Sequence, residues 1–320
     1  MDLAAPLGCG MNNAPFLAPA LLLSSLASAA THYVTLAGLG GEKEYEQRFA
    51  GMARDIDKIL AGSGGENRVH TLAGADATKE KVSALLGDIA RAASQNDEFV
   101  LILIGHGSFD GQEYKFNIPG PDLSAAELAA LCDRIAASRQ LIVNTTSSSG
   151  GSIAFFQKPG RAVVAATKTG SEKNATIFSR YWVEAMRDAA ADTDKNEVIS
   201  ALEAYRYADR RTTGFYETQK RLATEHAVLE DTGKGEAVRV PSAENGQGLL
   251  AGRFALVRIG SAQRAAADPA KRGLLEKKEI LEREIDKLKY EKAAMPYETY
   301  RKRLSELLLE LARTQEELEK

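Results

Sequence analysis

Residues 99–107 read FVLILIGHG, and this stretch decides the fold. Six consecutive apolar side chains are typical of a strand that is buried on both faces, as the strands of parallel sheets are. Further apolar segments that predict strands lie at 33–36, 69–72, 140–144 and 162–166. Helical patterns separate them, at 45–60, 78–93, 123–137 and 176–187. This alternation predicts an α/β fold with a mainly parallel sheet and helices on both faces.

Composition excludes several classes of protein. The chain has 320 residues, 44% of them hydrophobic, with 41 basic and 44 acidic side chains and a formal net charge of −3. These values are those of a globular protein rather than a disordered or fibrous one. No nucleic-acid partner is expected, because such binding needs a basic excess that neutralises phosphates. Cys9 and Cys132 cannot form a disulfide framework and lack the clustered spacing of a zinc site.

The N-terminal segment has the pattern of a signal peptide. Residues 14–27 read APFLAPALLLSSLA, an uncharged apolar run that is too short for a permanent membrane span. The run ends in Ala27-Ser28-Ala29, an A-x-A cleavage pattern. We therefore expect a signal peptide over 1–29 and an exported protein, periplasmic or secreted. No Lys or Arg precedes the run, and the alternative is an apolar strap on the domain.

The last fifty residues change in character, with 13 basic and 12 acidic side chains between Lys271 and Lys320. Leucines recur every seven residues on either side of Met295-Pro296, which predicts a helical hairpin of the coiled-coil type over 268–320. Such a hairpin packs on its own domain, forms a homo-oligomer or binds a partner protein. The apolar positions are Leu274, Leu281, Ile285 and Leu288, then Leu304, Leu308, Leu311 and Leu318.

The ends of two predicted strands carry residues of the types that proteins use for catalysis or ligand binding. In open parallel sheets, ligands and catalytic groups gather beyond the carboxyl ends of the strands. His106 and Gly107 follow the strand at 99–104, and a run of hydroxyl side chains at 145–149 follows the strand at 140–144. The chain has four histidines, so the candidates for histidine chemistry are few. The structural alternatives are a capped histidine at a strand end and a hydrogen-bonded turn.

This order of motifs resembles the caspase and legumain clan of cysteine peptidases, in which a strand ending in His-Gly precedes one ending in x-x-Cys-x-Ser-Gly. Ser149-Gly150 matches the Ser-Gly of that pattern, and Ser147 stands where the nucleophilic cysteine is expected. The segment 38–42, with Tyr45 and Phe49 behind it, is similar to bacterial legumain-like members. The resemblance covers about residues 31–230 and implies a caspase-like domain over 31–262.

The resemblance also implies roles for three residues. His106 would be the general base or acid, Ser147 would occupy the nucleophile position, and the Gly107 N–H would help to form an oxyanion hole. A serine hydroxyl needs an oriented base to remove its proton, whereas a cysteine thiol ionises more readily. The sequence identifies no carboxylate to orient His106, since Asp110 and Glu113 are equally loop charges. Ser147 is therefore an inactive relic, a working nucleophile or an engineered replacement of cysteine.

The expected function follows from these roles. The chain would be an exported homologue of caspase-fold and legumain-fold peptidases, degenerate or weakly active, that hydrolyses peptide bonds with a His106/Ser147 dyad if it is active. Whether it is an enzyme stays open at this point. The alternative is a non-catalytic protein of the cell envelope that binds peptides or acts as a scaffold and assembles through its C-terminal hairpin.

A second motif is independent of the first. Residues 192–203 read DTDKNEVISALE and resemble an EF-hand loop, which binds calcium through six to eight oxygen ligands. Glu197 stands at the sixth position, where glycine normally permits a sharp turn. An acidic helix cap is the alternative, and a long helix is expected from Val198 to about His226. The expected Ca²⁺ ligands are Asp192, Asp194, Asn196, the Val198 carbonyl, Ser200 and a bidentate Glu203.

Overall fold

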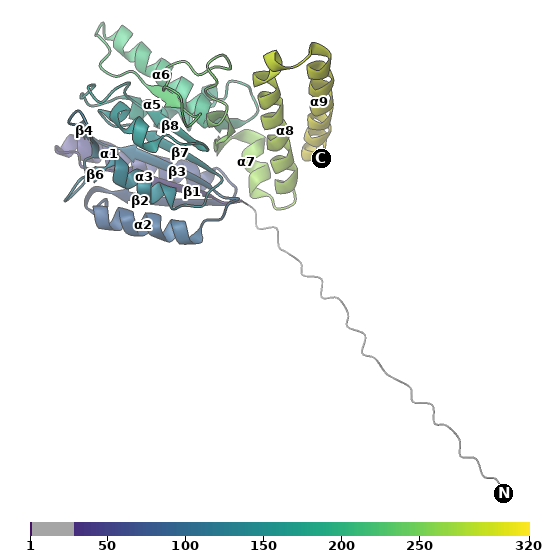
Figure 1. The fold of residues 1–320 in the computed structure, drawn as a ribbon, viewed down its shortest axis with the longest axis horizontal. Helices are drawn as coiled ribbons and strands as arrows, with labels where there is room; N and C mark the ends of the chain where they lie inside the picture. The colour runs from purple at the N-terminus through teal and green to yellow at the C-terminus, as the bar shows by residue number, and fades with distance from the viewer. Residues whose placement is uncertain (2–28) are drawn as a thin grey trace.

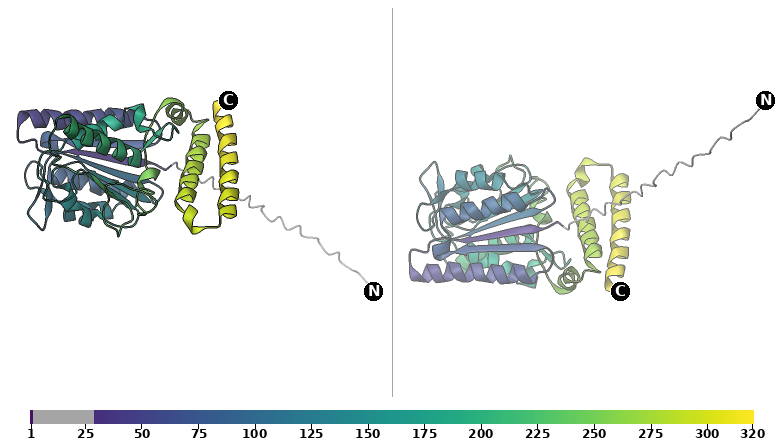
Figure 2. Two further views of the ribbon diagram at one scale, coloured as in Figure 1. Left: turned by 90° about the horizontal axis from the view of Figure 1, so that it is seen from above. Right: turned by 90° about the horizontal axis from the view of Figure 1, so that it is seen from below.

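The structure is a computed structural model that describes Met1 and residues 29–320. The predicted signal peptide, apart from Met1 and Ala29, lies outside the described residues. Within the described part, an α/β domain is followed by two antiparallel helices that stand across one end of it (Figures 1 and 2). None of the helices described is both long enough and apolar enough to cross a membrane.

The central sheet has six strands in the order β10-β8-β7-β3-β1-β2. Five of them are parallel, and only the short β10 runs antiparallel, against β8. The expected fold class, a mainly parallel α/β sheet with a C-terminal helical hairpin, is confirmed. The strands are β1 (Thr31–Ala37), β2 (Asn67–Ala73), β3 (Glu98–Ile104), β7 (Arg139–Asn144), β8 (Arg161–Ala165) and β10 (Val228–Glu230).

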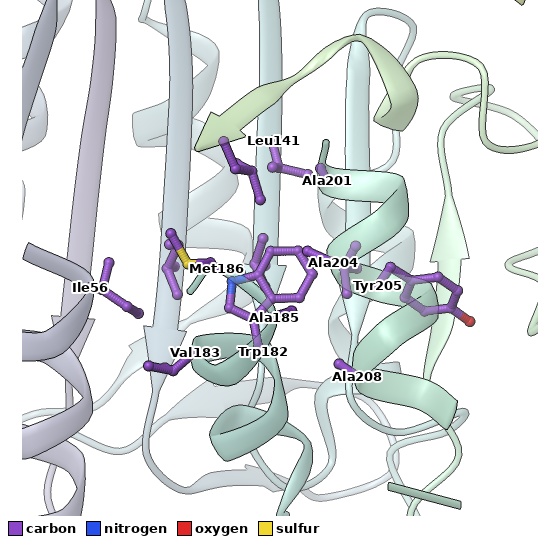
Figure 3. Close-up of a cluster of buried hydrophobic side chains, with 14 of the residues drawn as sticks. Ile56, Leu141, Trp182, Val183, Ala185, Met186, Ala201, Ala204, Tyr205 and Ala208 are labelled. Carbon is purple, nitrogen blue, oxygen red and sulfur yellow. The ribbon is translucent and has the colours of Figure 1, made fainter. Parts of the chain in front are cut away.

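Both faces of the sheet are covered by helices, as the continuous apolar character of β3 requires. Val100, Ile102 and Ile104 pack into one core with helices α1, α5 and α6. The alternate residues of β3 pack into a second core with α2, α3 and α4. Figure 3 shows Trp182, which is fully buried, at the centre of the first core. These helices are α1 (Lys43–Gly62), α2 (Lys79–Ala92), α3 (Ala125–Asp133), α4 (Ile153–Phe156), α5 (Phe178–Ala185) and α6 (Ala201–Thr218).

Helix ends correct several sequence predictions. The predicted Ser124–Glu127 capping box is present, but α3 ends at Asp133 instead of continuing to 137. The helix predicted from Val198 to His226 is wrong at both ends. Val198–Ser200 forms strand β9, which pairs with β11 (Ala255–Arg258), and α6 begins only after a second capping box between Ser200 and Glu203. Pairing with β11 therefore overrides the helical spacing of apolar residues over 198–200, and the cap at Ser200 sets the start of α6.

Two features had no counterpart in the sequence prediction. The chain after β3 forms a small antiparallel sheet of β4 (Gly107–Phe109), β5 (Tyr114–Phe116) and β6 (Leu123–Ser124). Strand β10 closes the edge of the main sheet. These strands are two or three residues long, so they are too short to show an alternating pattern.

The C-terminal hairpin consists of α8 (Arg272–Tyr290) and α9 (Tyr297–Glu319), joined at the predicted Met295-Pro296 turn and preceded by the short α7 (Gly260–Ala267). Leu281, Ile285 and Leu288 of α8 are buried as expected. Leu308 was expected in the apolar seam of α9, but its side chain is exposed. The hairpin crosses the amino ends of the sheet strands, because a crevice between them is lined by Thr31, Glu98, Arg139 and residues of α8.

Candidate functional site

The two predicted strand ends meet at the carboxyl edge of the sheet. Strands β3 and β7 are neighbours in parallel register, with Leu103 opposite Asn144. The loops that follow them therefore leave the sheet side by side. Ser147 reaches the main chain of Gly107, the residue that follows His106. The structure thus brings the nucleophile position next to the histidine segment.

The hydroxyl of Ser147 is fully engaged with the main chain of Gly107. It donates to the Gly107 carbonyl at 2.9 Å and accepts from the Gly107 N–H at 3.1 Å. The side chain is buried, with Ser147 3% exposed. In this arrangement the hydroxyl proton is held by a carbonyl oxygen, and the N–H that was expected to stabilise an oxyanion is occupied by the same hydroxyl.

His106 lies in an aromatic environment provided by α1. Its ring meets those of Tyr45 and Phe49 edge-on, with centroid distances of 4.9 and 5.2 Å. Burial lowers the pKa of His106, the Gly40 backbone counteracts this through a hydrogen bond, and the charge of Arg48 lowers the pKa further. The imidazole is therefore neutral at pH 7, the protonation state that a general base requires.

In the described part of the chain, this histidine lacks a carboxylate that would orient it. Among residues 29–320, no ion pair joins the His106 ring to an acidic side chain. Asp110 instead accepts hydrogen bonds from the N–H groups of Gln112 and Glu113, and Glu113 pairs with Lys115. Asp110 and Glu113 are therefore loop charges, one of the two interpretations left open by the sequence.

The hydroxyl run after β7 forms a buried, hydrogen-bonded turn. The Thr145 hydroxyl donates to the Leu103 carbonyl at 2.7 Å, and the Thr146 hydroxyl donates to Asn144 at 2.8 Å. Ser148 adopts a left-handed conformation, with φ of 57°, and its buried hydroxyl has no hydrogen-bond partner. Most of these hydroxyls therefore hold the loop in place, as the structural alternative in the sequence analysis proposed.

A phenylalanine fills the space beside this turn. The ring of Phe109 lies against both Gly151 and Gly170, and a Cβ atom on Gly151 would come within 2.6 Å of it. Only glycine fits this closely against the ring at these two positions. Phe109 and the two glycines therefore form a packed wall next to the Ser147 loop.

Sequence reasoning missed a second histidine at this edge. His226 Nδ1 lies 2.5 Å from the carboxylate of Glu172, whose own carbonyl accepts a hydrogen bond from the Ser148 N–H. The His226 side chain is 37% exposed. The two residues are 54 positions apart in the chain, so no local pattern in the sequence could have paired them.

The second motif lies at the other end of the sheet. Carboxylate oxygens of Asp192, Asp194 and Glu203 all lie within 4.8 Å of one another. Burial raises the pKa of Asp194 to about 6, and the charge of Glu203 contributes to this rise. The other predicted ligands, Asn196, Val198 and Ser200, line the same crevice as Asp194 and Glu203. The six residues therefore gather at one place.

The loop has hydrogen bonds that fix its shape. Asp192 accepts from the N–H groups of Asn196 and Glu197, at 3.2 and 3.1 Å. Glu203 accepts from the Thr193 N–H at 2.7 Å and also caps α6 through Ser200. The acidic helix cap that was the alternative to a calcium site is thus present. These hydrogen bonds use both carboxylate oxygens of Glu203, so bidentate binding of Ca²⁺ by Glu203 would compete with the cap.

Glu197 shows how the loop tolerates a side chain at its sixth position. Its φ is 67°, the left-handed conformation that glycine adopts without cost. The carboxylate bonds to the Ser261 hydroxyl and to the Ala262 N–H, so that it caps the first turn of α7. This contact offsets the backbone strain and connects the loop to the segment that leads into the hairpin.

Helix α8 adds further charges to the crevice. Glu282 and Asp286 line it opposite Asp194 and Glu203. Burial raises the pKa of Glu282 to about 7; its pairing with Lys278 opposes this rise, and the charge of Asp194 adds to it. The crevice between the loop and the hairpin therefore brings carboxylates and cations together. Its acidic residues are Asp194, Glu203, Glu279, Glu282 and Asp286, and its basic residues are Arg206, Arg253, Arg283 and Lys289.

Comparisons with known proteins give a limited result. No protein-family model and no curated protein matches the sequence. Among solved structures, one match is the crystal structure of the Drosophila initiator caspase Dronc, with 12% sequence identity and a TM-score of 0.41. The match covers 65% of this chain and 81% of that chain. The fold class itself rests on the strand order and the helical layers described above.

Proposed function

We propose that this protein is an exported homologue of the caspase-fold and legumain-fold peptidases whose peptidase site is degenerate. The observation that carries the proposal is the double hydrogen bond between the Ser147 hydroxyl and the Gly107 main chain. The motif order and the meeting of the two strand ends support kinship with peptidases. The engaged hydroxyl and the missing orienting carboxylate support the loss of activity.

Residual hydrolysis would require a rearrangement at this edge. The Ser147 hydroxyl would leave the Gly107 carbonyl and pass its proton to His106 while its oxygen attacks the peptide carbonyl. The freed Gly107 N–H would then be available to stabilise the oxyanion. The Gly40 backbone and the rings of Tyr45 and Phe49 hold the imidazole in place. No carboxylate among residues 29–320 pairs with it to stabilise its charged form, and the loss of such a group costs around 10⁴ in rate in serine peptidases. The resulting activity is weak at most.

A fluorophosphonate probe, which labels activated serines, tests this proposal. We expect no labelling of the wild-type protein at Ser147, and the Ser147→Ala variant serves as the control for labelling elsewhere. Labelling that Ser147→Ala and His106→Ala both abolish would show a working dyad and overturn the proposed degeneracy. Labelling of the Ser147→Cys variant with an iodoacetamide probe tests whether the site has lost only its nucleophile.

A second candidate function is a scaffold that assembles through the hairpin. The hairpin exposes large apolar side chains, namely Ile280, Tyr297, Leu308 and Leu309. Apolar side chains that form one contiguous surface patch are typical of sites that bind a second copy or another protein, and Leu308 and Leu309 are consecutive residues of α9. Sedimentation of the wild type and of a Leu308→Glu/Leu309→Glu variant tests self-association. If the wild type and the variant are both monomeric, self-association is excluded and the partner of the hairpin would have to be a different protein.

Calcium binding by the 192–203 loop is proposed on the gathering of Asp192, Asp194 and Glu203. Added Ca²⁺ is expected to raise the melting temperature, because a ligand that binds only the folded state stabilises it. Glu203→Gln would also weaken the α6 cap, so Asp194→Asn is the cleaner variant. A shift that persists unchanged in Asp194→Asn would remove this ligand assignment, and Mg²⁺ at equal concentration is the control for ionic strength.

A further inference from the structure

Ala30, at the start of the domain, makes a polar contact with Asp97. The N–H of Ala30 donates to Asp97 Oδ1 at 2.8 Å, and Ala30 and Asp97 are 4% and 7% exposed. The other carboxylate oxygen accepts from the N–H and the hydroxyl of Ser94, at 2.7 and 3.0 Å. Both residues lie where β1 begins beside β3, since the Glu98 N–H donates to the Ala30 carbonyl.

Asp97 carries a charge that lacks a strong cationic partner. Burial alone would raise its pKa, but hydrogen bonds from Ser94 and Ala30 lower the pKa below its ordinary value, so the carboxyl is ionised. Among residues 29–320, its one ion-pair contact is with His32, at 3.9 Å. His32 is 2% exposed and burial lowers its pKa. Within the described part of the chain, neither of its ring nitrogens has a hydrogen-bond partner. Buried carboxylates are normally paired with a full positive charge.

The predicted cleavage pattern ends one residue before this contact. Ala29 is exposed and lines the crevice between the sheet and α8, whereas Ala30 is buried against Asp97. Hydrolysis of the Ala29–Ala30 peptide bond consumes one water molecule. The new carboxylate is on Ala29 of the released peptide, and the new amine is on Ala30 of the remaining chain. At neutral pH that amine is largely protonated.

We propose that the mature chain begins at Ala30 and that its new ammonium group forms a buried ion pair with Asp97. Cleavage then supplies the missing cation at the atom that already donates to this carboxylate. The pair fastens the start of β1 to the turn before β3 at the amino edge of the sheet. Removal of the signal peptide thereby stabilises the domain. This inference rests on the proposed export and does not depend on whether Ser147 is catalytic.

A simpler explanation of Asp97 is a turn cap, because its carboxylate closes the 94–97 turn through Ser94. That explanation predicts the same stability for chains that begin before or at Ala30. The ion pair predicts a difference that depends on Asp97. The two explanations can therefore be distinguished by measuring the stability of chains that begin at different residues.

The experiment compares two chains with defined starts. Every strand and helix that the structure describes lies within 31–319, so both chains retain all of these elements. Chains that begin at Ala29 and at Ala30 are released from a cleavable fusion and melted at pH 7. We expect the Ala30 chain to melt about 2 to 4 °C higher, which corresponds to about 1 kcal/mol for a domain of this size. Asp97→Asn in both chains should abolish the difference.

Two outcomes would overturn the ion pair: equal melting temperatures for the two chains, or a difference that Asp97→Asn leaves intact. If Asp97→Asn fails to fold, Ala30 can be N-acetylated in the wild-type chain, which removes the charge and should lower the melting temperature to that of the Ala29 chain. The intact mass of the full chain after expression with export tests cleavage separately. A chain that keeps residues before Ala30 would overturn the maturation step.

Discussion

The two ends of the sheet differ in how much space surrounds the residues of the two predicted sites. At the carboxyl end, the residues with a catalytic pattern are packed and hydrogen-bonded, with Ser147 held by Gly107 and Phe109 filling the adjacent space. At the amino end, the described residues surround an open crevice lined by the acidic loop and by α8. The immediate surroundings of Ser147 are thus filled, and the pocket at this end lies beside β1 and β2 instead, lined by Gly38, Leu39 and Gly74. A motif places chemical groups, but packing decides whether they can act.

Replacing Gly107 by alanine is expected to have the largest effect. A Cβ atom there would lie 2.5 Å from the Tyr114 ring and 2.6 Å from the Ser147 carbonyl oxygen. Overpacking typically costs about 1 to 3 kcal/mol, and contacts this close place Gly107→Ala at about 3 kcal/mol. Urea unfolding would measure this loss of stability. Gly214→Ala in α6 is the control, because nothing lies within 4 Å of its added Cβ. A fully stable Gly107→Ala protein would show that the carboxyl end is less tightly packed than described.

Glu279→Gln is expected to weaken the packing of the hairpin against the amino end of the sheet. Glu279 of α8 makes a two-pronged ion pair with Arg258, at 2.6 and 2.9 Å, and is buried. Its loss leaves Arg258 without its charge partner, at a cost of about 2 to 3 kcal/mol. Hydrogen exchange should rise in α8 and α9 while the central strands stay protected. Glu310→Gln, which breaks an exposed pair with Lys277, should change stability by less than about 1 kcal/mol.

The crevice between the loop and the hairpin should also make stability depend on pH. The pKa of Glu282 is about 7 in the folded protein against an ordinary 4.5, so the folded state binds more protons between these values. Stability therefore falls as the pH rises from about 4.5 to about 7. Glu282→Gln should flatten this fall and gain about 1 to 2 kcal/mol at pH 8. Unfolding free energies of both proteins at pH 5 and pH 8 measure the effect; parallel pH profiles would contradict it.

The smallest effect concerns two matched helix caps, one near each end of the sheet. Ser124 caps α3 and Ser200 caps α6, each in a complete capping box. Alanine at either position should cost about 1 kcal/mol in the absence of Ca²⁺. Added Ca²⁺ should enlarge the cost of Ser200→Ala alone, since only Ser200 is a proposed ligand. Melting curves with and without the ion compare the two variants, and equal costs in both conditions would argue against Ser200 as a ligand.

The sequence predicted the elements whose signal is local and strong. The apolar run of β3, the capping box of α3 and the leucine spacing of the hairpin were each sufficient to place an element. The convergence of His106 and Ser147 segments also followed, because the ends of adjacent parallel strands share an edge. These predictions needed only periodicity and the rules of sheet topology.

Other features depend on contacts that the sequence does not encode locally. The capture of the Ser147 hydroxyl by Gly107 joins residues 40 positions apart, and the position of Phe109 depends on two distant glycines. The helix predicted at Val198 was wrong because pairing with β11 outweighs helical spacing over three residues. Tertiary pairing of this kind overrides local propensity.

The length of β3 has one further consequence. Its seven residues separate the hairpin from the Ser147 loop by roughly 20 Å, at about 3.3 Å per residue. A partner of the hairpin, as proposed above, would therefore not contact the Ser147 loop directly. The sheet would hold the hairpin and that loop at a fixed distance from each other.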